Sequence, residues 1–321
     1  MKRVLGLLAI IVLLFTLASC QKDKVEIAIV QLGTHTSLDE INQAITSKLE
    51  DNGYNEGDYE ITQHNANFSN DTANQIMQIL KNRADVVVAI ATPVAQAAYN
   101  VMPSDTPIVF AAVSDPVAAG LMTDVSSPNE NVTGTSDEIQ IDLIIDKALE
   151  IDPDLKKLGF IYNPNEDNSV SNKNKIEAYC QTKNIEFVAR TIQSAGEMSE
   201  VANVLVSNVD AVLVTDDNTV ASAMSVLGDI CVEAKKPCYT GADSLVKDGG
   251  MLCVGINYQT LGEYTADMVI EILNGKAISE IPVKVFNDNL KIYLNEDFVK
   301  NAEIVIPNSI LEDENLVKIT K

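Results

Sequence analysis

The sequence predicts an α/β protein of two doubly wound parallel-sheet lobes joined by three crossings of the chain. Short runs rich in Val and Ile alternate with segments of helical periodicity along most of the 321 residues. Continuous apolar runs between helices are typical of parallel strands that are covered on both faces. The pattern restarts once near the middle, and a hydrophobic content of 46% is sufficient for two cores.

The first half alternates regularly between strands and helices. Strands are predicted at residues 25–30, 60–63, 85–90 and 107–112. The helices expected between them cover residues 38–49, a segment from Ser69 or Asn70 through Leu80, and residues 93–101. Gly53 is expected to end the first of these helices.

The second half repeats this alternation. Asp137 is expected to open a helix that contains Ile141 and Leu149. Strands are predicted at residues 158–162, 186–192, 210–215 and 237–240, separated by helices at 171–183, 197–207 and 220–234. Crossings between the lobes are expected near residues 132–136, 255–257 and 277–282. The first lobe then comprises residues 25–134 and 257–278, and the second lobe residues 135–256 and 279–321.

The N-terminus has the layout of a secretory signal. Lys2 and Arg3 precede an uncharged apolar run over residues 4–15, which is too short to span a bilayer as a mature helix. The ending Leu-Ala-Ser-Cys at residues 17–20 resembles a bacterial lipobox, which implies a signal peptide over residues 1–19 and a lipid on Cys20. Residues 20–24 would form the tether. The alternative is an ordinary secretory signal with a chance cysteine.

Charge and cysteine content exclude several classes of protein. A net charge of −23 repels nucleic acid and anionic lipid surfaces. The four remaining cysteines form no Cys-x-x-Cys pair, which excludes the usual zinc and redox spacings; they are Cys180, Cys231, Cys238 and Cys253. Free buried thiols are expected, and a disulfide between Cys231 and Cys238 is the alternative.

Signatures of enzymes are missing from the sequence. It has no Gly-x-Ser-x-Gly elbow, no His-Glu-x-x-His, no phosphate-binding loop and no Gly-x-Gly-x-x-Gly. Its two histidines, His35 and His64, are too few for a histidine-rich metal site. We therefore expect no catalytic residues, no metal and no cofactor. His35 follows the first strand and is a candidate for a ligand contact, with a histidine on a surface loop as the alternative.

Hydrogen-bond donors follow two of the predicted strands. In open parallel sheets, ligands bind beyond the carboxyl ends of the strands. Thr92 follows the strand at 85–90 and is expected to cap the next helix, with Pro93 at its first position. Asn168 and Ser169 follow the strand that ends at Tyr162 and could offer donors to an anion, or could belong to a solvated loop.

Acceptors follow other strands. Ser114 and Asp115 follow the strand at 107–112, and Asp216, Asp217 and Asn218 follow the strand at 210–215. These carboxylates could bind an ammonium group, or could act as turn and helix caps. Gly-Ala-Asp at residues 241–243 repeats the arrangement and adds Asp243 as a candidate. Donors and acceptors together would suit the two charges of an amino acid.

Several of these segments carry a family resemblance that covers nearly the whole mature chain. They are residues 34–39, 91–96, 113–121, 162–169, 217–222 and 255–258, with Gly262 and residues 275–276. In these segments the chain resembles the substrate-binding lipoproteins of ABC transporters of the tryptophan/tyrosine type, which have the periplasmic-binding-protein type I fold. The resemblance implies two lobes that close on a small solute. It also implies ligand contacts at Thr92, Asp115, Asn168, Ser169 and Asp217.

The expected function is therefore that of a solute-binding lipoprotein of an ABC importer. The expected ligand is an aromatic or other apolar L-amino acid, and the expected partners are a permease and its ATPase. We expect a monomer outside the cytoplasm, anchored by its lipid to the membrane of a bacterial cell. Alternatives are a sugar or nucleoside ligand, a sensor ectodomain that signals to a membrane kinase, and a lipid-anchored enzyme.

Overall fold

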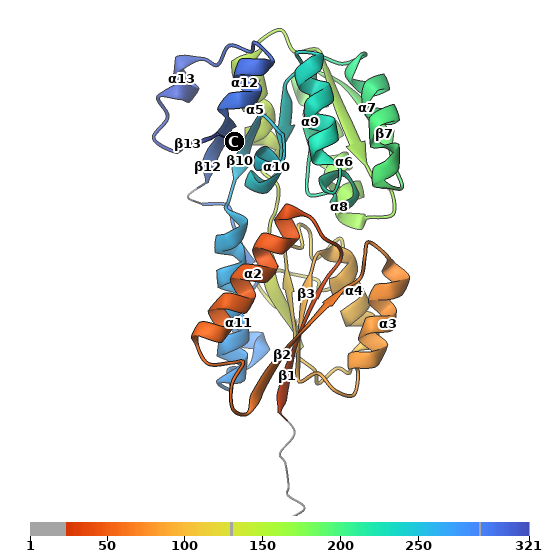
Figure 1. Cartoon of the computed structure of the whole chain (residues 1–321), viewed down its shortest axis with the longest axis vertical. Helices are drawn as coiled ribbons and strands as arrows, with labels where there is room; N and C mark the ends of the chain where they lie inside the picture. The colour runs from red at the N-terminus through yellow and green to blue at the C-terminus, as the bar shows by residue number, and fades with distance from the viewer. Residues whose placement is uncertain (1–23, 129–130, 289, 321) are drawn as a thin grey trace, which may run out of the picture.

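The computed structural model describes residues 24–128, 131–288 and 290–320, which fold into two α/β lobes stacked one above the other (Figure 1). The predicted signal peptide and Cys20 lie outside the described residues. Within the described ranges, no helix has both the length and the apolar character needed to cross a membrane.

The first lobe is built on a parallel six-stranded sheet in the order β11-β5-β4-β3-β1-β2. Its strands are β1 (Val25–Gln31), β2 (Tyr59–Asn65), β3 (Val86–Ile90), β4 (Ile108–Ala111), β5 (Val132–Ser136) and β11 (Lys284–Val285). Its helices are α2 (Thr36–Asp51), α3 (Asn70–Leu80), α4 (Thr92–Val101), α11 (Tyr258–Leu273) and the 3-10 turn η2 (Ile278–Glu280). Every residue of β3 is buried, as the continuous Val/Ile run predicts for a strand covered on both faces.

The second lobe contains a seven-stranded sheet in the order β13-β12-β10-β9-β8-β6-β7, in which only the β10–β12 pairing of the described residues is antiparallel. Its strands are β6 (Lys157–Tyr162), β7 (Glu186–Thr191), β8 (Ala211–Val214), β9 (Cys238–Thr240), β10 (Leu252–Gly255), β12 (Lys291–Asn295) and β13 (Leu316–Ile319). Its helices are α5 (Ile141–Ile151), α6 (Asp167–Lys183), η1 (Ala195–Glu197), α7 (Met198–Val206), α8 (Asn218–Ala221), α9 (Met224–Glu233), α10 (Asp243–Lys247), α12 (Glu296–Asn301) and α13 (Asn308–Leu311).

All eight predicted strands are present, and five further strands that were not predicted occur among the described residues, namely β5, β10, β11, β12 and β13. β5 has the sequence Val-Thr-Gly-Thr-Ser, which reads as a linker, yet all five residues are buried in the sheet. α5 begins at Ile141, so the expectation that Asp137 opens this helix is wrong. α6 begins at Asp167, earlier than predicted, and the single helix expected over 220–234 is two helices, α8 and α9.

The chain crosses between the lobes three times, as expected: from β5 to α5, from β10 to α11, and from β11 to β12. Two of the predicted boundaries need correction. The first crossing follows Ser136, because residues 132–136 form a strand of the first sheet. The third crossing lies after Val285, because Lys284 and Val285 still pair with Thr135 and Ser136 of the first lobe.

The order of the strands fixes where a ligand can enter. In the first sheet β2 and β3 lie on opposite sides of β1, and in the second sheet β7 and β8 lie on opposite sides of β6. Loops that leave such a switch point diverge and open a crevice beyond the carboxyl ends of the strands. In both lobes the segments after these strands lie at the boundary between the lobes, where α2, α4 and α8 begin (Figure 1).

The four described cysteines are buried and free, which confirms the expectation of free thiols. Burial raises the pKa of Cys180 to about 11. A hydrogen bond with the Cys231 thiol, followed by burial, raises the pKa of the Cys238 thiol. The Cys180 and Cys238 thiols are therefore protonated at neutral pH.

Helices α2 and α11 lie side by side along the first lobe and pack closely at a glycine (Figure 1). A Cβ atom added to Gly262 of α11 would lie 2.7 Å from Ala44 Cβ and 2.7 Å from the carbonyl oxygen of Ile41, both in α2. The backbone oxygen cannot move aside without displacing the helix.

We therefore expect Gly262→Ala to lower the free energy of unfolding by about 1–3 kcal/mol, because overpacking separates the two helices. Gly196→Ala is the matched control, since the nearest atom to its added Cβ is Ser194 Oγ at 3.8 Å. Urea unfolding followed by circular dichroism measures both variants. Equal stabilities would show that α2 and α11 tolerate a larger separation than their packing indicates.

Candidate functional site

A small cavity of about 20 Å³ lies between the lobes at the two switch points. This volume is far below the roughly 300–1,000 Å³ of small-molecule sites, so a ligand of amino-acid size requires the lobes to lie further apart than they do here. Five of the residues singled out in the sequence line it, namely His35, Thr92, Asn168, Asp216 and Asn218. Asp137 and Tyr258 also line it, together with the apolar side chains Leu38, Ala221, Ala242 and Leu245.

The first-lobe wall contains a strained turn that directs a hydroxyl group. Ala91 has φ +82°, and α4 starts at Thr92 with Pro93 in its first turn. Thr92 therefore does not cap the helix as expected, and its Oγ1 is buried without a hydrogen-bond partner. A second alanine with positive φ, Ala112 at +54°, follows β4 and also lines the cavity. Such conformations cost about 1–3 kcal/mol each and concentrate at functional sites.

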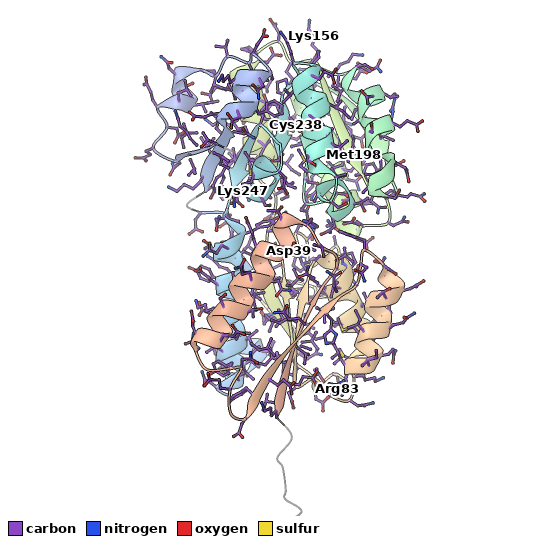
Figure 2. The ribbon with its side chains drawn as sticks, in the orientation of Figure 1. Asp39, Arg83, Lys156, Met198, Cys238 and Lys247 are labelled. Atoms are coloured by element: carbon purple, nitrogen blue, oxygen red, sulfur yellow. The ribbon has the colours of Figure 1, made fainter. Side chains whose placement is uncertain are left out.

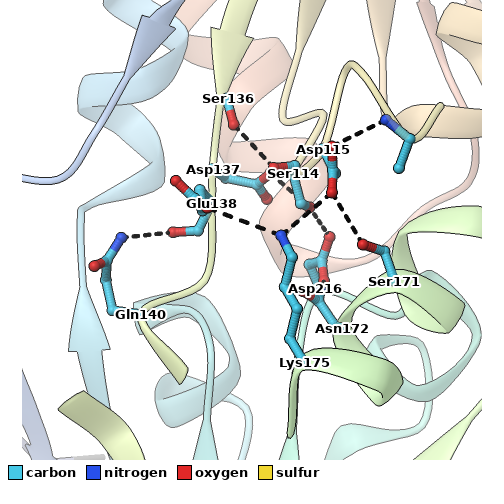
Figure 3. Close-up of polar contacts among 11 residues, drawn as sticks. Ser114, Asp115, Ser136, Asp137, Glu138, Gln140, Ser171, Asn172, Lys175 and Asp216 are labelled. Carbon is cyan, nitrogen blue, oxygen red and sulfur yellow. Dashed lines mark hydrogen bonds and ion pairs between the residues drawn. The ribbon is translucent and has the colours of Figure 1, made fainter. Parts of the chain in front are cut away.

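Two carboxylates face the cavity from opposite lobes and share one hydroxyl group (Figure 3). Ser114 Oγ lies 2.9 Å from Asp137 Oδ1 and also within hydrogen-bond distance of Asp216 Oδ2. The hydroxyl of Tyr258, at the start of α11, donates to Asp137 Oδ2 at 2.7 Å. Burial, followed by the nearby charge of Asp216, raises the pKa of Asp137 to about 7.

Amide groups from α6 orient Asp216. Asn172 Nδ2 donates to Asp216 Oδ1 at 2.5 Å, and Asn168 Nδ2 donates to Asp216 Oδ2 at 3.2 Å. Asn168 Oδ1 is left buried and without a partner. Burial raises the pKa of Asp216 as well. In the described residues, the hydrogen-bond partners of Asp137 and Asp216 are thus uncharged side chains.

Behind this surface, Glu166 fixes the start of α8. Its carboxylate accepts hydrogen bonds from the backbone N–H groups of Asn218 and Thr219, at 3.1 Å each, and from their side chains at 2.6 and 2.9 Å. Asn218 Nδ2 is therefore a donor to Glu166, so Asn218 Oδ1 accepts from His35 Nε2 at 3.2 Å. His35 Nδ1 remains buried and unpaired, and burial lowers the pKa of His35, which favours the neutral ring.

The other predicted residues brace the site without lining the cavity. Asp217 is buried and caps α8 by accepting from the Val220 N–H at 2.8 Å, and its Oδ2 accepts from the Asn163 N–H at 2.6 Å. Ser169 is buried beside Asp217, and burial raises the pKa of the Asp217 carboxyl. The family resemblance implies Asp217 as a ligand contact, whereas it is Asp216 that lines the cavity.

Asp115 and Asp243 also lie outside the cavity lining. Asp115 Oδ2 accepts from Ser171 Oγ at 3.0 Å and pairs with Lys175 Nζ at 3.3 Å, both on α6 of the other lobe (Figure 3). Asp243 is buried at the second crossing, where it accepts from Asn257 Nδ2 at 2.8 Å. Sequence reasoning missed Asp137 because β5 reads as a linker; recognising that strand would have placed Asp137 at its carboxyl end.

Direct contacts at the rim hold the lobes together. Thr36 Oγ1 donates to Asp248 Oδ1 at 2.9 Å, and the hydroxyls of Ser37 and Ser244 lie 2.7 Å apart. Lys247 Nζ of α10 pairs with Glu40 Oε1 of α2 at 2.8 Å. Figure 2 labels Lys247 and Asp39, another α2 residue, on either side of this boundary. The lobes are therefore closed over the cavity, and no group of metal-binding side chains occurs among the described residues.

The comparisons with known proteins agree on a single family. The family model described as ABC transporter substrate binding protein matches residues 26–318. A protein of Clostridioides difficile (strain R20291) named Tyrosine-binding protein is 36% identical over 285 residues, which are 88% of this chain and 82% of that protein.

Two solved structures add information about the arrangement of the lobes. The first is an ABC domain from Streptococcus pneumonia in complex with L-Trp, which is 31% identical, covers 91% of this chain and 100% of its own, and has a TM-score of 0.84. The second is the ligand-free, open structure of a substrate binding protein with adhesive properties from Clostridium difficile. It is 34% identical, covers 92% of this chain and 99% of its own, and has a TM-score of 0.68. A higher identity with a lower TM-score is what a different arrangement of similar lobes produces.

The match over residues 26–318, the two parallel sheets and the closed cavity between them lead to one conclusion. This chain belongs to the ABC transporter substrate-binding proteins, a family of extracytoplasmic binding proteins and not of enzymes.

Proposed function

We propose that this protein binds an aromatic L-amino acid between its lobes and delivers it to the permease of an ABC importer. The observation that carries the proposal is the pair of carboxylates, Asp137 and Asp216, that face one cavity with uncharged partners. A buried carboxylate needs a positive charge or a proton. The ammonium group of an amino acid provides that charge and donates up to three hydrogen bonds.

The opposite charge of the ligand would be bound at the start of α4. Thr92 Oγ1 is an unpaired donor in the cavity wall, and the first N–H groups of α4 have no partners within the helix. A helix N-terminus of this kind favours a carboxylate. An amino acid spanning from α4 to Asp216 would contact both lobes, so its binding energy would favour the closed arrangement.

The ligand side chain would contact the apolar part of the cavity. Leu38, Leu245 and the ring of Tyr258 line it, and His35 Nδ1 is a hydrogen-bond acceptor without a partner. A phenol hydroxyl or an indole N–H could donate to such an acceptor. The relatives whose names or titles include tyrosine and L-Trp support this choice of ligand.

A thermal-shift screen followed by calorimetry tests the ligand. L-tyrosine, L-tryptophan and L-phenylalanine should raise the melting temperature, because they bind the folded state alone. The amine-free analogue 3-(4-hydroxyphenyl)propionate should bind at least tenfold more weakly than L-tyrosine, a loss of about 1.4 kcal/mol or more. Stabilisation by sugars or nucleosides alone would contradict the proposal, and equal affinity of the analogue would remove the ammonium contact.

Thr92→Val tests the carboxylate end. The exchange removes a donor to the ligand but also removes a buried, unpaired hydroxyl, so we expect about tenfold weaker binding and an unfolding free energy that is unchanged or higher. Thr215→Val is the matched control, because Thr215 Oγ1 is also buried and unpaired but does not line the cavity. Affinities that fall equally in both variants, or in neither, would contradict this role for Thr92.

We further propose that the mature protein is a lipoprotein anchored through Cys20 and that it acts as a monomer. The apolar run and the small residues before Cys20 support the anchor. Cys20→Ala should move the protein from the membrane to the soluble fraction, because the thiol that carries the acyl chains is lost. Ser19→Ala should leave it on the membrane, because both residues are small. Membrane retention of Cys20→Ala on fractionation would contradict the anchor.

A further inference from the structure

The hydroxyl group of Ser114 faces two carboxylate oxygens but has only one hydrogen to donate. Ser114 Oγ is within hydrogen-bond distance of Asp137 Oδ1 and of Asp216 Oδ2. A hydroxyl group has one hydrogen and can donate to one of these oxygens only. The second contact is a hydrogen bond only if a carboxyl O–H donates to Ser114 Oγ. Protonation of one of the two carboxyl groups would make both contacts hydrogen bonds.

The other partners of the pair are unable to replace that proton. The Tyr258 hydroxyl and the amides of Asn168 and Asn172 donate hydrogen bonds but carry no charge. Asp137 is 4% exposed, so water screens its charge poorly. A second observation points to a ligand at this place: Asn168, 3% exposed, lines the cavity with Oδ1 unpaired.

Charged groups on the surrounding elements do not neutralise the pair. Asp217 and Glu166 lie behind it and carry no positive charge: burial, followed by the charge of Asp217, raises the pKa of Glu166 to about 8, and burial raises the pKa of Asp217. His35, before α2, is neutral because burial lowers its pKa. Lys175 of α6 pairs with Asp115 and Glu138, at 3.3 and 3.8 Å (Figure 3). Burial raises the pKa of Tyr258, so that its phenol stays uncharged.

The pair exists only when the lobes are closed. Ser114 and Asp137 follow β4 and β5 of the first sheet, whereas Asp216 follows β8 of the second sheet. Separation of the lobes would return both carboxylates to water, where each is ionised at neutral pH. Closure of the empty protein must then bring two negative charges to one hydroxyl group.

We propose that Ser114, Asp137 and Asp216 form a site for one cation that is completed by lobe closure, and that a proton and the ammonium group of the ligand are its alternative occupants. The ammonium half of this inference rests on the proposed amino-acid ligand, whereas the proton half concerns the empty protein. Closure without ligand then takes up one proton, and closure on an amine does not require it.

The direction of the pH dependence follows from the raised pKa values. Asp137 has a pKa of about 7 in the closed arrangement, and an aspartate in water has a pKa of about 4. The stabilisation of the closed form by protonation is therefore complete below about pH 4, where the carboxyl group is protonated in both forms. The closed-to-open ratio of the empty protein falls as pH rises towards 7, by up to about tenfold per pH unit. At neutral pH and above, repulsion between the carboxylates keeps the empty protein open.

The experiment measures the distance between spin labels on the two lobes of the empty protein from pH 5 to pH 8. Exposed positions on α3 and α7 carry the labels, through Gln75→Cys and Glu200→Cys, while the four described native thiols are buried. The closed fraction should fall with rising pH, and L-tyrosine or L-tryptophan should restore it at pH 8. A closed fraction that is independent of pH, or that rises with pH, would overturn the proposal.

Two variants and a control locate the effect. Asp216→Asn and Asp137→Asn each leave one carboxylate, so each should flatten the pH profile and raise the closed fraction at pH 8. Asp115→Asn is the matched control, because Asp115 also lies at the lobe boundary but outside the cavity lining. It should retain the wild-type pH dependence. A flat profile in Asp115→Asn, or a wild-type profile in both cavity variants, would refute the assignment.

Failure of this inference is distinguishable from failure of the proposed function. If no amino acid binds, the pH-dependent closure of the empty protein still reports on the carboxylate pair. If amino acids bind but the empty protein closes equally at pH 5 and pH 8, the ligand assignment stands and the proton site is wrong.

Discussion

The central constraint in this protein is that closure places two carboxylates, one from each lobe, against a single hydroxyl group. A buried negative charge is tolerated only with a counter-charge or a proton. The uncharged donors around Asp137 and Asp216 orient the two groups but leave the charge uncompensated. The closed arrangement is therefore complete only when something positive occupies the cavity, and a ligand ammonium group has the right charge and hydrogen-bonding capacity.

The distribution of lysines across the boundary fits this constraint. Lys175 and Lys247 lie at the rim, where they pair with Asp115 and Glu40 of the first lobe. Partly exposed pairs of this kind are worth about 0–1 kcal/mol each, so they favour closure weakly. A lysine placed beside Asp216 would neutralise the cavity permanently and would compete with the ligand. Among the described residues, attraction is therefore confined to the rim, and the centre is left for the ligand to neutralise.

Much of the architecture could be predicted from the sequence, because the central strands β1, β3, β6 and β8 are largely apolar runs. The residues that follow β3, β6 and β8 could be placed near a ligand by topology alone, and Thr92, Asn168 and Asn218 do line the cavity. The choice between Asp216 and Asp217 could not be made, since adjacent residues after a strand point in different directions. Asp137 was missed because β5 is stabilised by hydrogen bonds of Thr133 and Thr135 and not by large apolar side chains.

The strained backbone at Ala91 explains why Thr92 presents its hydroxyl to the cavity, although the sequence predicts that Thr92 caps α4. A threonine at the N-cap would use its hydroxyl on its own helix, and nothing would remain for a ligand. Ala91 adopts a positive φ instead. The free-energy cost of this conformation is offset by the packing of the preceding strand β3, which is fully buried. The chain then enters α4 one residue earlier, and Thr92 Oγ1 is left unpaired. The first lobe thus presents the unpaired hydroxyl of Thr92, and Asp137 and Asp216 present an uncompensated negative charge between the lobes. One zwitterionic ligand can pair with both.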